Sequence, residues 1–157
     1  MKSKHFSVLM LVFVACVACY VGSWLLWWSK VSEAKRSIDN KLFPAAEQQL
    51  QFAADISRPF SFFDFRYHYS QYVLGTTYGL DNKQPLAEAI FRQMEPLYKG
   101  ENKPFAPTEF DVLFAYGSVY VSSYQPAKAV PLFERALSIL EDQKKIDSQP
   151  GATVLHI

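Results

Sequence analysis

Residues 74–78 read Leu-Gly-Thr-Thr-Tyr, and residues 116–120 read Tyr-Gly-Ser-Val-Tyr. In both places an alanine follows nine residues after the last tyrosine, and a phenylalanine follows four residues after the alanine. The matching positions are Gly75, Tyr78, Ala87 and Phe91, then Gly117, Tyr120, Ala129 and Phe133. Two unrelated helical segments would share an amphipathic period but not four residue types at the same steps, so we interpret the pattern as an internal repeat.

The repeated residue types suit a pair of packed helices. Glycine carries no side chain, so a partner helix can approach closely, and a tyrosine three residues later lies on the same helix face. The alanine then provides a small surface on the second helix, and the phenylalanine fills the space between successive pairs. The sequence therefore predicts helix–turn–helix units.

This pattern resembles the tetratricopeptide repeat, whose two helices carry L-G-x-x-Y and then A-x-x-x-F. There are departures from it. The glycines lie 42 residues apart, whereas the family's unit is about 34 residues long, and we attribute the excess to a loop inserted at 99–107. Gln71 stands where the family has an early leucine or aromatic residue, and Glu141 stands where it has a closing proline.

A half repeat precedes these two units. Ala46, Leu50 and Ala53 match a second helix alone, with no first helix before it. We therefore expect an all-α fold in which a short tetratricopeptide-like array of about two and a half repeats follows one N-terminal transmembrane helix. The expected parts are an anchor at 1–30, a juxtamembrane linker or helix extension at 31–43, the repeat domain at 44–145 and a flexible tail at 146–157.

Prolines and caps set the expected helix ends. Thr108 is predicted to cap a helix with Asp111 as its partner three residues on, and Pro131 is expected to delay or kink the start of the last helix. The predicted helices run over 44–56, 60–80, 85–97, 109–123 and 126–145.

The N-terminal stretch Phe6–Trp28 contains no charged residue. As a helix it measures ~34 Å, enough to cross a hydrocarbon core of ~30 Å. Indole rings prefer the headgroup level and lysine can extend toward it, so we expect these residues at the membrane interface: Trp24, Trp27, Trp28 and Lys30.

Two alternatives to an uncleaved anchor are a secretory signal cut after Ala18 and a lipoprotein signal ending at Cys16. The apolar run continues ten residues past Ala18, which favours the anchor. The flanking cations do not agree on orientation. Lys30, Lys35 and their neighbours would keep the domain in the cytoplasm, whereas the short leading tail resembles a signal anchor of a bacterial inner-membrane protein. We expect the second arrangement, with the C-terminal domain in the periplasm.

Catalytic chemistry is not indicated. Cys16 and Cys19 both lie in the apolar segment, where a thiolate is disfavoured, and the three histidines are far apart in the chain. Asp64 and Arg66 are expected to form solvated pairs. The formal net charge of +1 argues against nucleic acid. We therefore expect no enzyme activity, no cofactor, no metal and no nucleic-acid partner.

The family resemblance implies a concave groove, lined by first helices, that binds peptides or proteins. The positions carried over are Tyr69, Tyr72, Thr76, Asp111, Phe114, Ser118 and Val121. Alternatively the short array closes on itself and these aromatics are core. Because about three repeats are usually needed for stability, we expect support from a protein partner, self-association or the bilayer.

The leading hypothesis is a membrane-anchored scaffold or adaptor that binds other subunits of a membrane or envelope complex. A second copy of the same chain is a further candidate partner. The alternatives are an accessory subunit whose transmembrane helix makes the essential contacts, and an assembly chaperone. The C-terminal Val154–Ile157 is expected to be a loose tail, with strand addition to a partner as the alternative.

Overall fold

The computed structural model describes residues 2–99 and 105–142, with side chains from residue 8 onward. In these residues every regular element is helical, which confirms the all-α prediction. The expected tail, including Val154–Ile157, lies outside the described residues. The elements are α1 (Lys2–Asp39), α2 (Phe43–Ser57), the 3-10 turn η1 (Arg58–Phe60), α3 (Arg66–Leu80), α4 (Gln84–Tyr98), α5 (Glu109–Ser122) and α6 (Pro126–Asp142).

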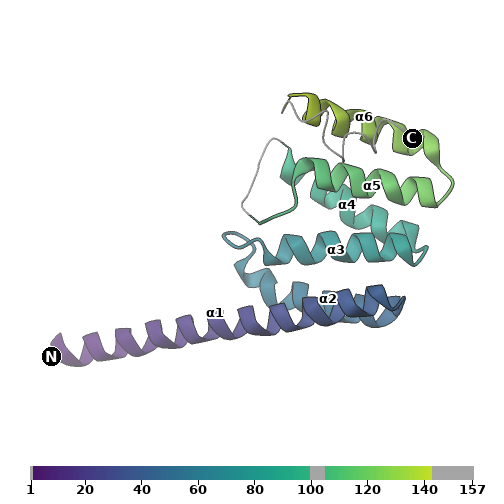
Figure 1. The fold of residues 1–157 in the computed structure, drawn as a ribbon. Helices are drawn as coiled ribbons and strands as arrows, with labels where there is room; N and C mark the ends of the chain where they lie inside the picture. Colours follow the sequence, from purple (N-terminus) through teal and green to yellow (C-terminus); the bar gives the residue numbers. More distant parts are fainter. Residues whose placement is uncertain (1, 100–104, 143–157) are drawn as a thin grey trace.

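The helices stack as consecutive hairpins, α1 with α2, α3 with α4 and α5 with α6 (Figure 1). Each second helix also packs on the first helix of the next hairpin. The half of α1 nearest the N-terminus extends to the left beyond the stack, whereas its other half lies along α2. The domain is thus a short array that begins inside the long N-terminal helix.

The turns between the paired helices are built alike. A residue with positive φ follows each first helix, at 58° for Lys41, 56° for Asn82 and 58° for Tyr124. The amide of the next residue donates to a carbonyl five residues back, at 2.8 Å in all three turns. These are helix C-caps in the left-handed conformation, and they recur at steps of 41 and 42 residues.

The first hairpin differs from the sequence expectation. No first helix was expected before Ala46, and the second half of α1 takes that place. Ala34, which is fully buried, stands 41 residues before Gly75 and is its counterpart in the repeat. Alanine replaces glycine here and Ser37 replaces the tyrosine, so the signature is missing although the packing is retained.

The sequence predicts a helix that starts at Phe60, whereas α3 begins at Arg66. Asp64 explains the later start, because its Oδ1 accepts the Arg66 backbone amide at 2.9 Å and supplies a helix-start acceptor. The expected capping box at Thr108 and Asp111 is present on α5. Pro131 does not delay α6, which already begins at Pro126.

Each repeated glycine lies directly against the phenylalanine ring of the other helix in its hairpin. A Cβ on Gly75 would lie 3.0 Å from the Phe91 ring, and one on Gly117 would lie 2.8 Å from the Phe133 ring. The remaining repeat positions are buried: Tyr78, Tyr120, Ala87 and Ala129. Phe91 also stacks on Tyr116 of α5, with centroids 5.6 Å apart, so it bridges two hairpins.

By length and composition, α1 is long and apolar enough to cross a membrane. Its large apolar side chains from Val8 to Val17 are exposed, and none of its most apolar 18-residue window is buried in the domain. An apolar surface of this length needs a cover other than water.

Candidate functional site

An apolar groove lies between α3 and α5, the first helices of the second and third hairpins. It is a cavity of about 380 Å³. It brings together four of the residues that the sequence had assigned to a groove: Tyr72, Thr76, Phe114 and Ser118. Its other lining residues are Gly79, Leu80, Ala115, Val119 and Ser122.

Gly79 and Val119 form the closest approach in this groove. A Cβ on Gly79 would lie 2.6 Å from Val119 Cγ2. Gly79 was not among the sequence-predicted site residues. Its place four residues after Gly75 was the available signal, because residues four apart share one helix face.

The serine and threonine hydroxyls in the groove already donate hydrogen bonds within their own helices. Thr76 Oγ1 donates to the Tyr72 carbonyl at 2.9 Å, and Ser118 Oγ donates to the Phe114 carbonyl at 2.8 Å. Such bonds to the preceding helical turn leave little capacity for polar ligands. None of the described residues that line the groove is charged. The groove therefore suits an apolar ligand surface.

Tyr72 lines the groove, and its ring centroid lies 6.4 Å from that of Phe91. Burial raises the pKa of its phenol to about 12, with smaller contributions from the nearby charge of Asp111 and from Tyr69. The phenol is therefore neutral at physiological pH. Asp111 does not line the groove but caps α5, where its Oδ2 accepts the Thr108 amide at 2.8 Å.

Two other predicted groove residues lie elsewhere. Tyr69 packs against Trp27 of α1 with ring centroids 5.9 Å apart, and Lys35 lies over its ring. Val121 is exposed and does not line the groove. The groove is thus confined to the second and third hairpins.

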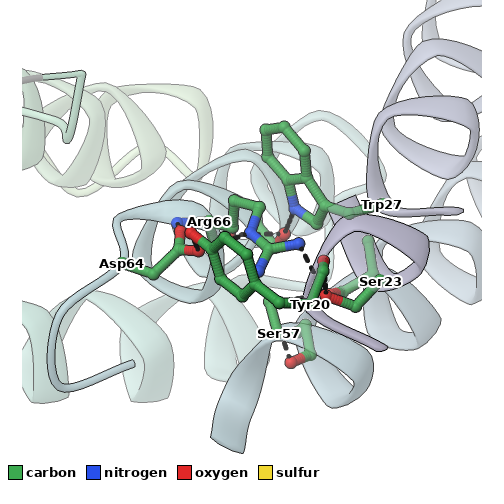
Figure 2. A network of polar contacts seen from close by, with 9 residues as sticks. Tyr20, Ser23, Trp27, Ser57, Asp64 and Arg66 are labelled. Carbon is green, nitrogen blue, oxygen red and sulfur yellow. Dashed lines mark hydrogen bonds and ion pairs between the residues drawn. The ribbon is translucent and has the colours of Figure 1, made fainter. Parts of the chain in front are cut away.

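The junction between α1 and α3 is filled by a polar network (Figure 2). Arg66 is fully buried, and its Nε donates to Asp64 Oδ2 at 2.7 Å while Nη1 donates to Ser23 Oγ at 3.1 Å. Tyr20 donates its hydroxyl to the same carboxylate oxygen at 2.9 Å. Asp64 and Arg66 are therefore not the solvated pair that the sequence suggested, because α1 covers them.

Aromatic rings surround the Arg66 guanidinium. Its central carbon lies 5.1 Å from the Tyr20 ring, 5.4 Å from Trp24 and 5.4 Å from Phe60. Cation–π contacts of this kind strengthen when they are removed from water. Nη2 is buried and has no hydrogen-bond partner in the described part of the chain.

Two of the residues expected at the membrane interface, Trp24 and Trp27, pack against the protein itself. Trp27 is 2% exposed and donates its indole N–H to Ser70 Oγ at 2.8 Å. Trp24 is half-buried, with its ring 6.2 Å from Phe65. Trp28 is exposed, and Lys30 pairs with Glu33 at 2.7 Å. Trp27 therefore joins α1 to α3 and is covered by the protein itself.

No protein-family model matches the sequence, and comparisons with curated proteins and with solved structures gave no match. Within residues 2–99 and 105–142, no group of three or more His, Cys, Asp or Glu side chains is placed to hold a metal ion.

Proposed function

We propose that this chain is a membrane-anchored interaction module of a bacterial envelope complex, and that the groove between α3 and α5 holds an apolar segment of a partner subunit. The apolar groove beside Phe114 carries the proposal, because its serine and threonine hydroxyls donate within their own helices. The module binds and does not catalyse. In this proposal α1 crosses the inner membrane and the domain lies in the periplasm.

The size of the groove limits what can enter it. A volume of about 380 Å³ takes a few apolar side chains and not a whole helix. The partner therefore inserts anchor residues from an amphipathic helix or an extended segment, as in helix-in-groove recognition. The neutral phenol of Tyr72, which lines the groove, supplies a hydrogen-bond donor.

The test is photo-crosslinking in the intact membrane. A photoreactive phenylalanine analogue is placed at Ser118 in the groove, and in a control at Gln93, which is exposed on α4 outside it. The expected result is one defined crosslinked protein from Ser118 and none from Gln93. Identical products from both positions, or no product from Ser118, would contradict the proposal.

A blocking variant tests the same site by another route. Ser118→Tyr fills the groove from a half-buried position without removing a core side chain. Mild-detergent purification should then lose the partner that wild type retains, while Gln93→Tyr retains it. Retention of the partner by both variants would show that the groove is not the binding site.

A second candidate is an accessory subunit in which α1 makes the essential contact. The observation that favours it is the exposed apolar surface of α1 ahead of the domain, at Leu9, Leu11 and Phe13. Replacing residues 6–19 with an unrelated apolar sequence leaves Tyr20 and the following domain contacts intact. The module proposal expects function to survive this swap, and the accessory-subunit proposal expects its loss.

A further inference from the structure

Exposed phenylalanines cluster at one end of the domain. Phe62 is 97% exposed, Phe63 is 68% exposed and Phe105 is 82% exposed. They lie in the loops before α3 and before α5, which in Figure 1 are at the left, the side toward which α1 extends. The turn between α5 and α6 lies at the opposite end. Large rings with this exposure are unfavourable in water, so the cluster points to a contact surface.

This edge lies directly beside α1. The Tyr20 ring is 5.3 Å from Phe60 and 6.1 Å from Phe63, measured between centroids. Phe105 reaches the same cluster through Phe65, at 5.8 Å. The phenylalanine edge therefore continues the apolar surface of α1 at the level of Tyr20.

The length of α1 shows where a bilayer surface would fall. Residues 6–19 precede the first domain contact and measure ~21 Å as a helix, about 9 Å less than a ~30 Å hydrocarbon core. On the face away from the domain, exposed apolar side chains continue past Tyr20 at Val21, Leu25 and Trp28. A bilayer that covers this face extends beyond Tyr20 and so reaches the level of Phe62 and Phe63.

We propose that the loop at residues 60–65, together with Phe105, inserts into the interfacial layer of the phospholipid bilayer as a second membrane contact beside α1. Aromatic rings are favoured at this depth. Charges at this depth must be satisfied within the protein. Asp64 and Arg66 meet that condition, because both are buried and paired with each other.

The Arg66 network gives this contact a mechanical role. Tyr20 and Ser23 on α1 bind Asp64 and Arg66, which flank the start of α3. The inserted loop and the transmembrane helix are therefore held as one body, and the domain cannot swivel about α1. This inference rests on α1 crossing the bilayer, as proposed above, and not on the groove.

The experiment measures lipid contact residue by residue. In a full-length Cys16→Ala/Cys19→Ala background, a bimane label is attached to Phe62→Cys, where its ring replaces the phenyl ring. Matched labels at Phe13→Cys on α1 and at Tyr124→Cys, which is 94% exposed in the α5–α6 turn, serve as references. The protein is reconstituted at high dilution in phosphatidylcholine vesicles with acyl chains brominated near the headgroup.

The expected result is bromine quenching at position 62 several-fold stronger than at position 124. Adding Phe63→Asp should reduce quenching at position 62. Leu86→Asp, at an exposed position of α4, should leave the quenching at 62 unchanged. Quenching at 13 but not at 62 would overturn the inserted loop while leaving the anchor intact. Absence of quenching at both positions would overturn the membrane crossing itself, and with it this inference and the anchored module.

Discussion

The two junctions between neighbouring first helices are built in opposite ways. Where α1 meets α3, a buried ion pair, a tryptophan and several rings fill the space. Where α3 meets α5, the helices touch closely at Gly79 and Val119 and leave an apolar groove beside that contact. The filled junction holds the domain against its anchor, and the open one leaves a surface for another molecule. Substitutions at matched places should separate these two roles.

The largest effect is expected at the filled junction. Asp64→Ala leaves the Arg66 guanidinium buried without its counterion, which typically costs about 3–5 kcal/mol. Denaturant unfolding of the full chain in micelles measures the loss. The double variant Asp64→Leu/Arg66→Met should recover much of it, since an apolar pair carries no unpaired charge. If the double variant proved as unstable as Asp64→Ala, the unpaired charge would not be the cause.

The same substitution at each junction gives a sharper comparison. Ser70→Ala leaves the buried Trp27 indole N–H without its acceptor, at a cost of about 1–3 kcal/mol. Ser118→Ala removes only a bond to its own helix at a half-buried position, and its effect should stay within about 0.5 kcal/mol. Thermal unfolding of both variants checks this. Equal losses would mean that the two junctions are not distinguished by polar contacts.

The third prediction concerns Gly79 and Val119, the closest approach of α3 and α5 in the groove. Gly79→Ala gains about 1 kcal/mol in helix propensity. It also places a methyl group 2.6 Å from Val119 Cγ2, and overpacking of this kind costs about 1–3 kcal/mol. We expect a net loss of stability of about 1 kcal/mol. Val119→Ala in the same chain should relieve it, and a double-mutant cycle measures the coupling.

The repeat was readable from sequence because its residues are local. The Gly75–Phe91 and Gly117–Phe133 contacts each join the two helices of one hairpin. The two residues of each pair are therefore the same distance apart in the sequence, and this repeated spacing indicates the contact. The groove residues Tyr72 and Phe114 followed from the same register. The positive φ angles in the turns, at Lys41, Asn82 and Tyr124, were not predicted, because none of these residues is a glycine.

The α1–α3 junction could not be predicted, for two physical reasons. Its contacts join residues 43 or 44 positions apart, such as Ser23 with Arg66 and Tyr20 with Asp64, and no periodicity links them. The hydropathy of residues 6–28 also hides a change of environment within one helix. Val17 needs an apolar cover outside the domain, whereas Trp27, with similar apolar character, is covered by the protein itself.

The smallest predicted effect concerns the phenol of Tyr72, which lines the groove. Its pKa is raised from 10.0 to about 12, chiefly by burial, so the folded state favours the neutral form. The resulting stability is fully present below pH 10 and is lost as the pH rises from 10 through 12. Burial also raises the pKa of Tyr98 and Tyr120, so alkaline titration of phenolate absorbance should show several late-titrating tyrosines, one fewer in Tyr72→Phe.

That titration also distinguishes an open groove from a filled one. Ser118→Phe adds apolar cover beside Tyr72 without adding a second phenol. It should move the Tyr72 ionisation to still higher pH, because desolvation is the main cause of the shift. Ser70→Ala, at the other junction, should leave it unchanged. If Ser118→Phe left the ionisation of Tyr72 unchanged, the groove would already be closed by its own side chains. The α3–α5 junction would then be core, like its neighbour.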